Sequence, residues 1–258
     1  MTLNLLSEIL ELLCIRNVLK AAIRRITEHN VCRISPRVLR TLPHNVTSFT
    51  QGLIYYNHSL YESTGLNGKS SLRKIRPSDG KETTVHHLDQ DQFGEGIALL
   101  NGMIYQLTWK SEKAIVYDAA TLHKVKELNY TGEGWGLAAT KSHLIMSNGS
   151  SRLTFRDESF RVSHSLRISS NGIPLRHIND IEWAQGKIYA NVLNSQDILE
   201  INGSTGCLER IIDCANLLAA EHPGDRGHVL NGIAYCENSN TFFLTGKCWK
   251  RIYEVELS

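Results

Sequence analysis

The sequence predicts an all-β fold assembled from five copies of one repeat. Five short segments can be superposed, and each starts with a side chain that carries a polar group; they start at Gln51, Glu95, Trp135, Asn179 and Asn231. Each segment continues with apolar residues and is followed by a turn and a second β-rich run. A repeat of about 40 to 50 residues is typical of a four-stranded propeller blade. We therefore predict a five-bladed β-propeller.

The turns and the second runs support this repeat. Asn101-Gly102 and Gln185-Gly186 are turn sequences of the kind that close a β-hairpin. The second runs cover Ser59–Ser63, Met103–Trp109, His143–Asn148, Lys187–Leu193 and Thr241–Gly246. A β-sandwich also contains many short strands, but it would not repeat one Gly-apolar onset in this way.

The fifth blade needs a strand from elsewhere in the chain. We expect the segment around Ile34–Leu42 to supply its outermost strand and to close the ring, which removes an exposed sheet edge. The chain then divides into an N-terminal helical extension, residues 1–33, and a propeller domain, residues 34–258. In the extension, apolar residues recur at helical spacing and predict an amphipathic helix; they are Leu5, Ile9, Leu12, Leu19, Ile23 and Ile26.

The composition is that of a soluble globular protein, with 41% hydrophobic and 21% charged residues. A net charge of +2 does not point to a nucleic-acid partner. Glu8 and Glu11 interrupt the apolar stretch near the N-terminus, so we expect neither a signal peptide nor an integral membrane span. The six cysteines show no metal-ligand spacing and are expected to be reduced. We expect a monomer, and the compartment is left open.

The innermost strands of a propeller line a central channel, which gives the first residues of each repeat a particular place. Small residues allow the strands to approach closely near the axis, and they are Gly52, Gly96, Gly136 and Gly232. The polar groups just before them should form a ring at one mouth of the channel. Together with Phe49, Phe93 and Trp109 they could bind a small molecule. Alternatively, they only satisfy strand ends or channel waters.

The same positions carry a resemblance to a known family. The matching stretches run in order from about residue 41 to residue 256 and are residues 43–44, 49–53, 60–66, 70–73, 93–97, 106–109, 132–137, 189–192, 229–234 and 245–247. In these stretches the chain resembles the glutaminyl cyclases of the plant and bacterial type. These acyltransferases convert the N-terminal glutamine of peptides and proteins to pyroglutamate with release of ammonia.

The resemblance implies a five-bladed propeller whose site lies at the channel mouth and needs no catalytic metal or other cofactor, with a structural divalent cation in the channel as an open option. It implies a peptide or protein with N-terminal glutamine as the partner. Members of the family are often secreted or periplasmic. The site residues that it carries over are Phe49, Gln51, Phe93, Glu95, Trp109, Trp135, Asn179 and Lys247.

Two positions depart from the family pattern. The family usually has Asn-Glu-Leu-Glu where this chain has Asn179-Asp180-Ile181-Glu182. It also usually has tryptophan where this chain has Leu193. The resemblance therefore implies that Leu193 replaces one aromatic wall of the glutamine pocket, so substrate affinity or range should differ.

The chemistry assigns roles to these residues. Cyclisation requires the neutral α-amine of glutamine to attack its own side-chain carbonyl and to expel ammonia. Glu95 is the candidate that accepts the amine proton and delivers one to the leaving nitrogen. Lys247, Gln51 and the indole N–H of Trp135 are candidate donors to the oxyanion. Alternatively, Glu95 pairs with Lys247 for structure alone, a role that we expect instead for Glu62, Glu133 and Glu182.

Two other functions remain open from the sequence. A metal-dependent propeller hydrolase or lactonase would hold calcium in the channel, for which Glu95, Asn179, Asp180 and Asn231 have suitable oxygen ligands. A non-catalytic peptide-binding propeller would have lost turnover when Leu193 replaced tryptophan.

Overall fold

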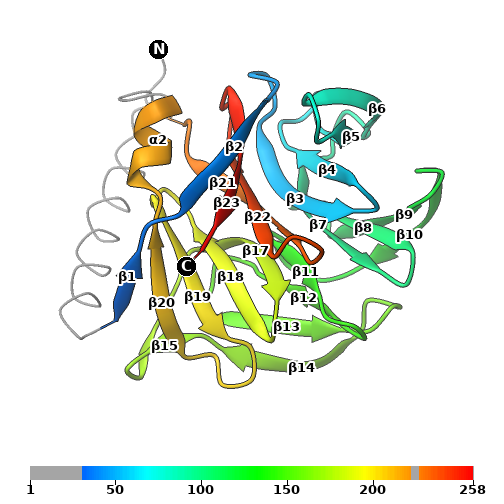
Figure 1. The fold of residues 1–258 in the computed structure, drawn as a ribbon. Coiled ribbons are helices and arrows are strands. Elements are labelled where there is room, and N and C mark those ends of the chain that lie inside the picture. Colours follow the sequence, from blue (N-terminus) through cyan, green and yellow to red (C-terminus); the bar gives the residue numbers. More distant parts are fainter. Residues whose placement is uncertain (1–30, 222–226, 258) are drawn as a thin grey trace, which may run out of the picture.

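The chain forms a ring of four-stranded antiparallel blades, in a computed structural model that describes residues 31–221 and 227–257 (Figure 1). Blade one contains β3 (Thr50–Tyr56), β4 (Ser59–Thr64), β5 (Ser71–Arg76) and β6 (Lys81–His87). Blade two contains β7 (Gly94–Leu100), β8 (Met103–Thr108), β9 (Lys113–Asp118) and β10 (Lys124–Asn129). Blade three contains β11 (Leu137–Ala139), β12 (Leu144–Met146), β13 (Arg152–Arg156) and β14 (Val162–Arg167).

The last two blades include strands from the beginning of the described chain. Blade four contains β17 (Ile178–Ala184), β18 (Lys187–Val192), β19 (Asp197–Asn202) and β20 (Leu208–Asp213), with β1 (Cys32–Ile34) added parallel to β20. Blade five contains β21 (Leu230–Cys236), β22 (Thr241–Gly246), β23 (Arg251–Glu256) and β2 (Arg37–Pro43). A small hairpin, β15 (Ser169–Ser170) with β16 (Ile173–Pro174), and helix α2 (Ala215–Glu221) complete the elements. The predicted five-bladed propeller is confirmed, whereas the predicted N-terminal helix lies outside the described residues.

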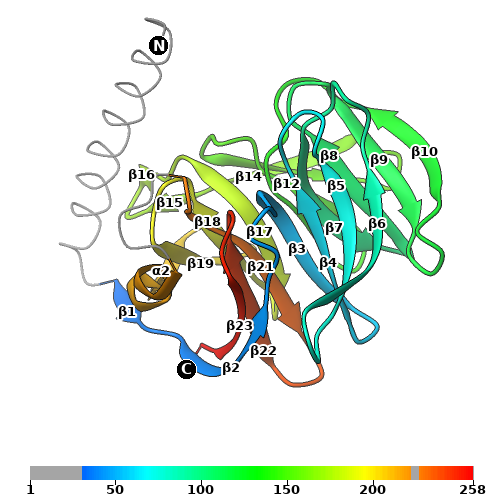
Figure 2. The same ribbon diagram turned by 90° about the horizontal axis from the view of Figure 1, so that it is seen from above.

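The ring is closed as the sequence predicts. β2 pairs antiparallel with β23 from Arg37 opposite Glu256 to Pro43 opposite Arg251. Figure 2 shows the C-terminal end of the chain beside β2. The addition of β1 to blade four was not predicted; it is a three-residue strand whose Arg33 forms ion pairs with Asp197 and Asp213 at 2.7 and 3.1 Å.

A buried ion pair fastens the closure. His44, just after β2, lies 2.8 Å from a carboxylate oxygen of Glu62 on β4, and its Nδ1 lies 2.8 Å from the carbonyl oxygen of Trp249. Burial lowers the pKa of His44, but the charge and hydrogen bond of Glu62 outweigh this and raise it. Burial likewise raises the pKa of Glu62, but His44 and the hydroxyl of Thr50 outweigh this and lower it. The structural role expected for Glu62 is thus a link between the closing strand and blade one.

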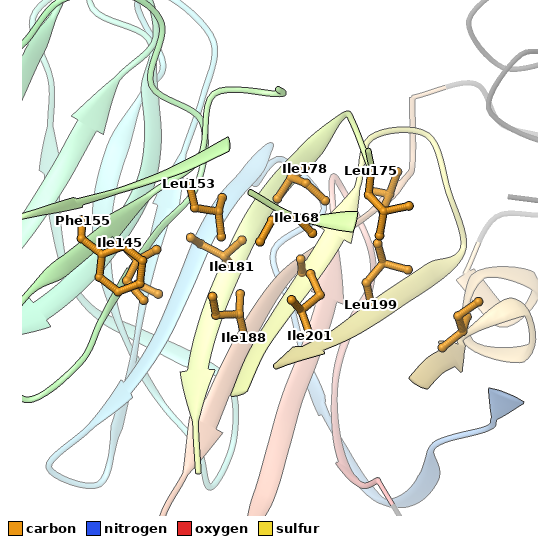
Figure 3. Packing of buried hydrophobic residues seen from close by; sticks show 14 residues of the cluster. Ile145, Leu153, Phe155, Ile168, Leu175, Ile178, Ile181, Ile188, Leu199 and Ile201 are labelled. Atoms are coloured by element: carbon orange, nitrogen blue, oxygen red, sulfur yellow. The ribbon is translucent and has the colours of Figure 1, made fainter. Parts of the chain in front are cut away.

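Apolar side chains fill the spaces between neighbouring blades. In the largest cluster, Ile145 and Leu153 of blade three face Ile181 and Ile188 of blade four (Figure 3). All four side chains are buried, as expected for facing sheets that alternate inward and outward residues. This packing fixes the angle between blades and hence the position of each innermost strand.

The innermost strands approach one another as closely as the glycines predict. A Cβ atom on Gly52 would lie 2.7 Å from the backbone nitrogen of Ile97 in blade two. A Cβ atom on Gly96 would lie 2.4 Å from the backbone nitrogen of Leu137 in blade three. Any larger residue would therefore push two blades apart. The predicted hairpin turns are also confirmed, since both residues of Asn101-Gly102 and of Gln185-Gly186 have positive φ.

Candidate active site

One mouth of the channel gathers the predicted site residues, and strand direction explains why. Each innermost strand begins at this mouth, and the second strand of each blade ends there, because the two are antiparallel. In blade two, for example, Gly94 at the start of β7 pairs with Thr108 at the end of β8. The strand starts place Gln51, Glu95, Trp135 and Asn179 at this mouth, with Phe49 and Phe93 just before them. The strand ends place Trp109, Leu193 and Lys247 there.

A chain of polar side chains crosses the mouth from blade five to blade two. The amide nitrogen of Asn231 donates to the side-chain oxygen of Gln51 at 3.3 Å and to the carbonyl of Thr50 at 3.0 Å. The amide nitrogen of Gln51 then donates to a carboxylate oxygen of Glu95 at 3.3 Å. All three side chains are buried, with Glu95 only 5% exposed. Gln51 therefore orients the carboxylate that sequence reasoning singled out.

The electrostatic surroundings favour the protonated form of Glu95. Burial raises the pKa of Glu95 well above its usual range, the positive charge of Lys247 opposes this rise, and the negative charges of Asp180 and Glu133 add to it. Burial lowers the pKa of Lys247, against the opposing charge of Glu95. A carboxyl group with a raised pKa can both accept and release a proton near neutral pH.

Aromatic rings surround this pair of ionisable groups. The rings of Phe49 and Phe93 meet edge to face with their centroids 6.4 Å apart, and Phe93 meets Trp109 at 5.6 Å. The ammonium nitrogen of Lys247 lies 4.6 Å from the ring centroid of Phe49, within the range of a cation–π contact. Burial is the largest cause of the raised pKa of the neighbouring Glu95.

Gly65, which sequence reasoning did not assign to the site, controls the position of these rings. A Cβ atom there would lie 2.3 Å from Cε1 of Phe93 and 3.1 Å from Cγ of Gln51. The backbone nitrogen of Gly65 also donates to the carbonyl of Phe49 at 2.8 Å. The signal in the sequence was its position in the matching stretch at residues 60–66, but only the fold shows which side chain it faces.

The two indoles at this mouth share one partner. Trp109 and Trp135 donate their indole N–H groups to the same oxygen of Glu133, at 2.9 and 3.0 Å. The Trp135 indole, predicted as a donor to the oxyanion, is therefore engaged by Glu133 in this structure. The charged donor beside Glu95 is Lys247.

The two departures from the family pattern lie on blade four. Leu193 is half-buried at the mouth, and its backbone nitrogen donates to the carbonyl of His177 at 2.9 Å. Asp180 is buried, and one of its carboxylate oxygens accepts the backbone N–H of Ile233 at 3.0 Å. Asp180 causes no distortion of its own, because the pairing is irregular at the same place in β3, β7 and β21.

The opposite mouth of the channel holds a cavity of about 360 Å³, away from Glu95. It is lined by the ends of the innermost strands, including Tyr55, Trp183, Tyr235 and Glu182. The carboxylate of Glu182 accepts the backbone N–H groups of Trp183 and Tyr235 at 2.8 and 3.3 Å. Burial raises the pKa of Glu182 to about 8. Glu182 thus ties blade four to blade five, as a structural carboxylate would.

Within residues 31–221 and 227–257, no three His, Cys, Asp or Glu side chains are grouped so that they could hold a metal ion. No helix there is long and apolar enough to cross a bilayer. Four cysteines in these ranges are free thiols; they are Cys32, Cys207, Cys214 and Cys236.

Comparison with known proteins agrees with this arrangement. The family model described as glutamine cyclotransferase matches residues 10–257. The chain belongs to the glutamine cyclotransferase family. It is 36% identical over 225 residues to a glutaminyl-peptide cyclotransferase of Arabidopsis thaliana, covering 85% of this chain and 70% of the relative. The crystal structure of a glutaminyl cyclase from Myxococcus xanthus superposes with a TM-score of 0.82 at 32% identity, covering 89% of this chain and 99% of the other. The family predicted from the sequence motifs is confirmed.

Proposed function

We propose that this member of the family is a glutaminyl-peptide cyclotransferase, an acyltransferase that converts N-terminal glutamine of peptides and proteins to pyroglutamate and releases ammonia. The observation that carries the proposal is the buried Glu95, oriented by Gln51 and accompanied by Lys247 inside a ring of aromatic side chains. Family membership and the glutaminyl-peptide cyclotransferase of Arabidopsis thaliana support it.

Cyclisation of glutamine requires a group that moves a proton from the attacking amine to the leaving nitrogen. The α-amine nitrogen forms a bond to the side-chain carbonyl carbon, and the ionised carboxylate of Glu95 takes the proton that this nitrogen loses. The resulting tetrahedral intermediate carries a negative oxygen, for which Lys247 supplies a positive charge. Glu95 then returns the proton to the amide nitrogen, the bond from carbon to that nitrogen breaks, and ammonia leaves. One carboxyl group thus acts as base and then as acid.

Binding contributes as well, because a free glutamine side chain samples many rotamers in which amine and carbonyl are apart. Phe93 and Trp109 form an aromatic surface against which the folded-back side chain can lie. Asn179, buried at 4% exposure on blade four, supplies an amide to the opposite side of the mouth. Holding the two reacting atoms in contact lowers the entropic part of the barrier.

The test is incubation with a dipeptide that begins with glutamine, followed by mass measurement of ammonia loss. Glu95→Gln keeps the size of the side chain but cannot carry a proton, so we expect kcat to fall by roughly 10²–10⁴-fold. The matched control is Glu182→Gln, the same change at the opposite mouth, which should leave kcat within about twofold. Activity of Glu95→Gln near that of the control would remove Glu95 from the mechanism.

The same assay separates the other functions. A peptide-binding propeller without turnover would bind the dipeptide and release no ammonia. A metal-dependent enzyme would lose activity in chelator, whereas a cyclase of this design needs only the proton transfers described above and should keep it. We also propose that the protein acts as a monomer, since all residues of the proposed site come from one chain; light scattering on the purified protein tests this.

A further inference from the structure

Glu133 occupies a position that its expected structural role does not explain. It lies two residues before Trp135, in the segment that leads into β11 of blade three. One of its carboxylate oxygens accepts the indole N–H of Trp135 at 3.0 Å and that of Trp109, from blade two, at 2.9 Å. A single oxygen therefore joins two aromatic side chains that come from neighbouring blades and face the same mouth.

Each of the two indoles is also held from another side. The ammonium nitrogen of Lys110 lies 4.0 Å from the ring centroid of Trp109 and 3.9 Å from the second oxygen of Glu133. Gly149 leaves room for the ring of Trp135, since a Cβ atom there would lie 2.7 Å from it. The rings are thus confined on their faces, and the hydrogen bonds to Glu133 fix their rotation about the remaining side-chain torsions.

The ion pair with Lys110 is not the main contribution of Glu133. The side chains of Lys110 and Glu133 are 63% and 42% exposed, and exposed pairs of this kind contribute little to stability. Hydrogen bonds to a charged acceptor are stronger and more directional than those to a neutral one. The carboxylate is therefore placed to orient the indoles, and it stays accessible at the mouth where substrate enters.

Glu133 also acts on Glu95 through its charge. Burial and three charged groups influence the pKa of Glu95: burial raises it most, Lys247 opposes this, and Asp180 and Glu133 raise it further. Asp180 lies deep in the channel, whereas Glu133 lies in the same wall as the indoles. Removal of the Glu133 charge should therefore lower the pKa of Glu95 without changing its hydrogen bond to Gln51.

We propose that Glu133 is a positioning residue of the cyclisation site, whose carboxylate holds the Trp109 and Trp135 indoles in the orientation that walls the glutamine pocket. The proposal rests on the proposed function for its kinetic consequences, but the orientation of the indoles is a property of the free protein. It assigns to Glu133 a role in substrate binding that the sequence alone did not indicate.

Two variants separate orientation from charge. Glu133→Ala removes the acceptor and the charge, whereas Glu133→Gln keeps an oxygen that can accept an indole N–H and removes only the charge. We expect Glu133→Ala to raise KM for a Gln-initiated dipeptide about tenfold with a smaller change in kcat, the pattern of lost substrate binding. We expect Glu133→Gln to keep KM within about threefold and to shift the acidic limb of the kcat/KM profile to lower pH. The control is Glu127→Gln on the outermost strand β10, which should change neither quantity.

Acrylamide quenching of tryptophan fluorescence tests the free protein independently of turnover. Released indoles in Glu133→Ala should be quenched more strongly than those of wild type and of Glu127→Gln. Unchanged KM and unchanged quenching in Glu133→Ala would overturn the proposal, as would a tenfold rise in KM in Glu133→Gln equal to that in Glu133→Ala. If wild-type protein releases no ammonia, the proposed function fails while the quenching result still decides the orientation. If Glu133→Ala does not fold, KM and quenching of Glu133→Gln decide: a tenfold rise in KM without stronger quenching contradicts the proposal, because the loss of binding would then not come from released indoles.

Discussion

Gly65→Ala should damage the site without straining the backbone. The added Cβ atom would lie 2.3 Å from Cε1 and 2.5 Å from Cζ of Phe93. Carbon atoms in contact are about 3.5–4.0 Å apart, so the ring edge has to move by more than about 1 Å. Gly65 is not among the glycines with positive φ, so alanine can adopt its backbone conformation. The perturbation is therefore directed at Phe93.

The displaced ring should lower activity more than stability. A misplacement of about 1 Å in a positioned site can cost roughly 10²-fold in rate, and overpacking typically costs about 1–3 kcal/mol of stability. We expect kcat/KM for a Gln-initiated dipeptide to fall by about 10- to 100-fold, while the thermal unfolding midpoint drops only by a few degrees. The double variant Gly65→Ala/Phe93→Leu provides the control, because leucine has no ring edge at that place.

The effect of Gly65→Ala in wild type and in Phe93→Leu shows whether the loss of activity comes from the clash with the Phe93 ring. If the loss arises from the clash, adding Gly65→Ala to Phe93→Leu should lower kcat/KM far less than adding it to wild type. Wild-type activity of Gly65→Ala would refute the reasoning, because the loop could then move away without disturbing Phe93. A full, additive loss in the double variant would place the effect elsewhere, for example at the 3.1 Å approach to Gln51.

Further predictions concern the wall at Leu193 and the pair that fastens the ring. Leu193→Trp should lower KM for short Gln-peptides about three- to tenfold with little change in kcat, since an aromatic contact contributes about 0.5–1.5 kcal/mol beyond burial; an unchanged KM would mean that the pocket is built around leucine. The pKa of His44 is raised in the folded protein. Its stabilising contribution is therefore complete below pH 6.5 and is lost as the pH rises through the higher pKa of the folded state. The pKa of Glu62 is lowered in the folded protein. Its stabilising contribution is therefore present above pH 4.5 and is lost as the pH falls through the lower pKa of the folded state. His44→Gln should cost about 3–5 kcal/mol in urea unfolding near pH 6 and less at alkaline pH; a cost independent of pH would contradict the ion pair.

The sequence was sufficient for the blades because their signals are local. Glycines such as Gly52 and Gly96 mark the innermost strands, and the Asn101-Gly102 turn marks a hairpin. β1 was not predicted because a strand of three residues is too short to show a periodic pattern. The ion-pair partners of its Arg33, Asp197 and Asp213, also lie far away in the sequence. Its position in blade four follows only from the closed ring.

The sequence predicted which residues form the site better than it predicted the contacts that these residues make. The equivalence of the repeats places Gln51, Glu95 and Asn179 at one mouth whatever their side chains do. The role of Glu133 could not be read in the same way, since a residue in a loop before a strand can turn its carboxylate in any direction. Gly65 shows the same limit, because the residue it faces, Phe93, belongs to the next blade.

Closure of the ring by β2 has a consequence for the order in which the protein folds during synthesis. Arg37 finds its partner Glu256 across 219 positions of sequence, so this pairing cannot form until residue 256 has left the ribosome. Pairings of such separation are slow steps of folding. Until then blade five, which contributes Asn231 and Lys247, has no outer strand to hold it against its neighbours. A nascent chain can therefore assemble earlier blades in order of synthesis, but a competent mouth arises only after β23 has emerged and paired with β2.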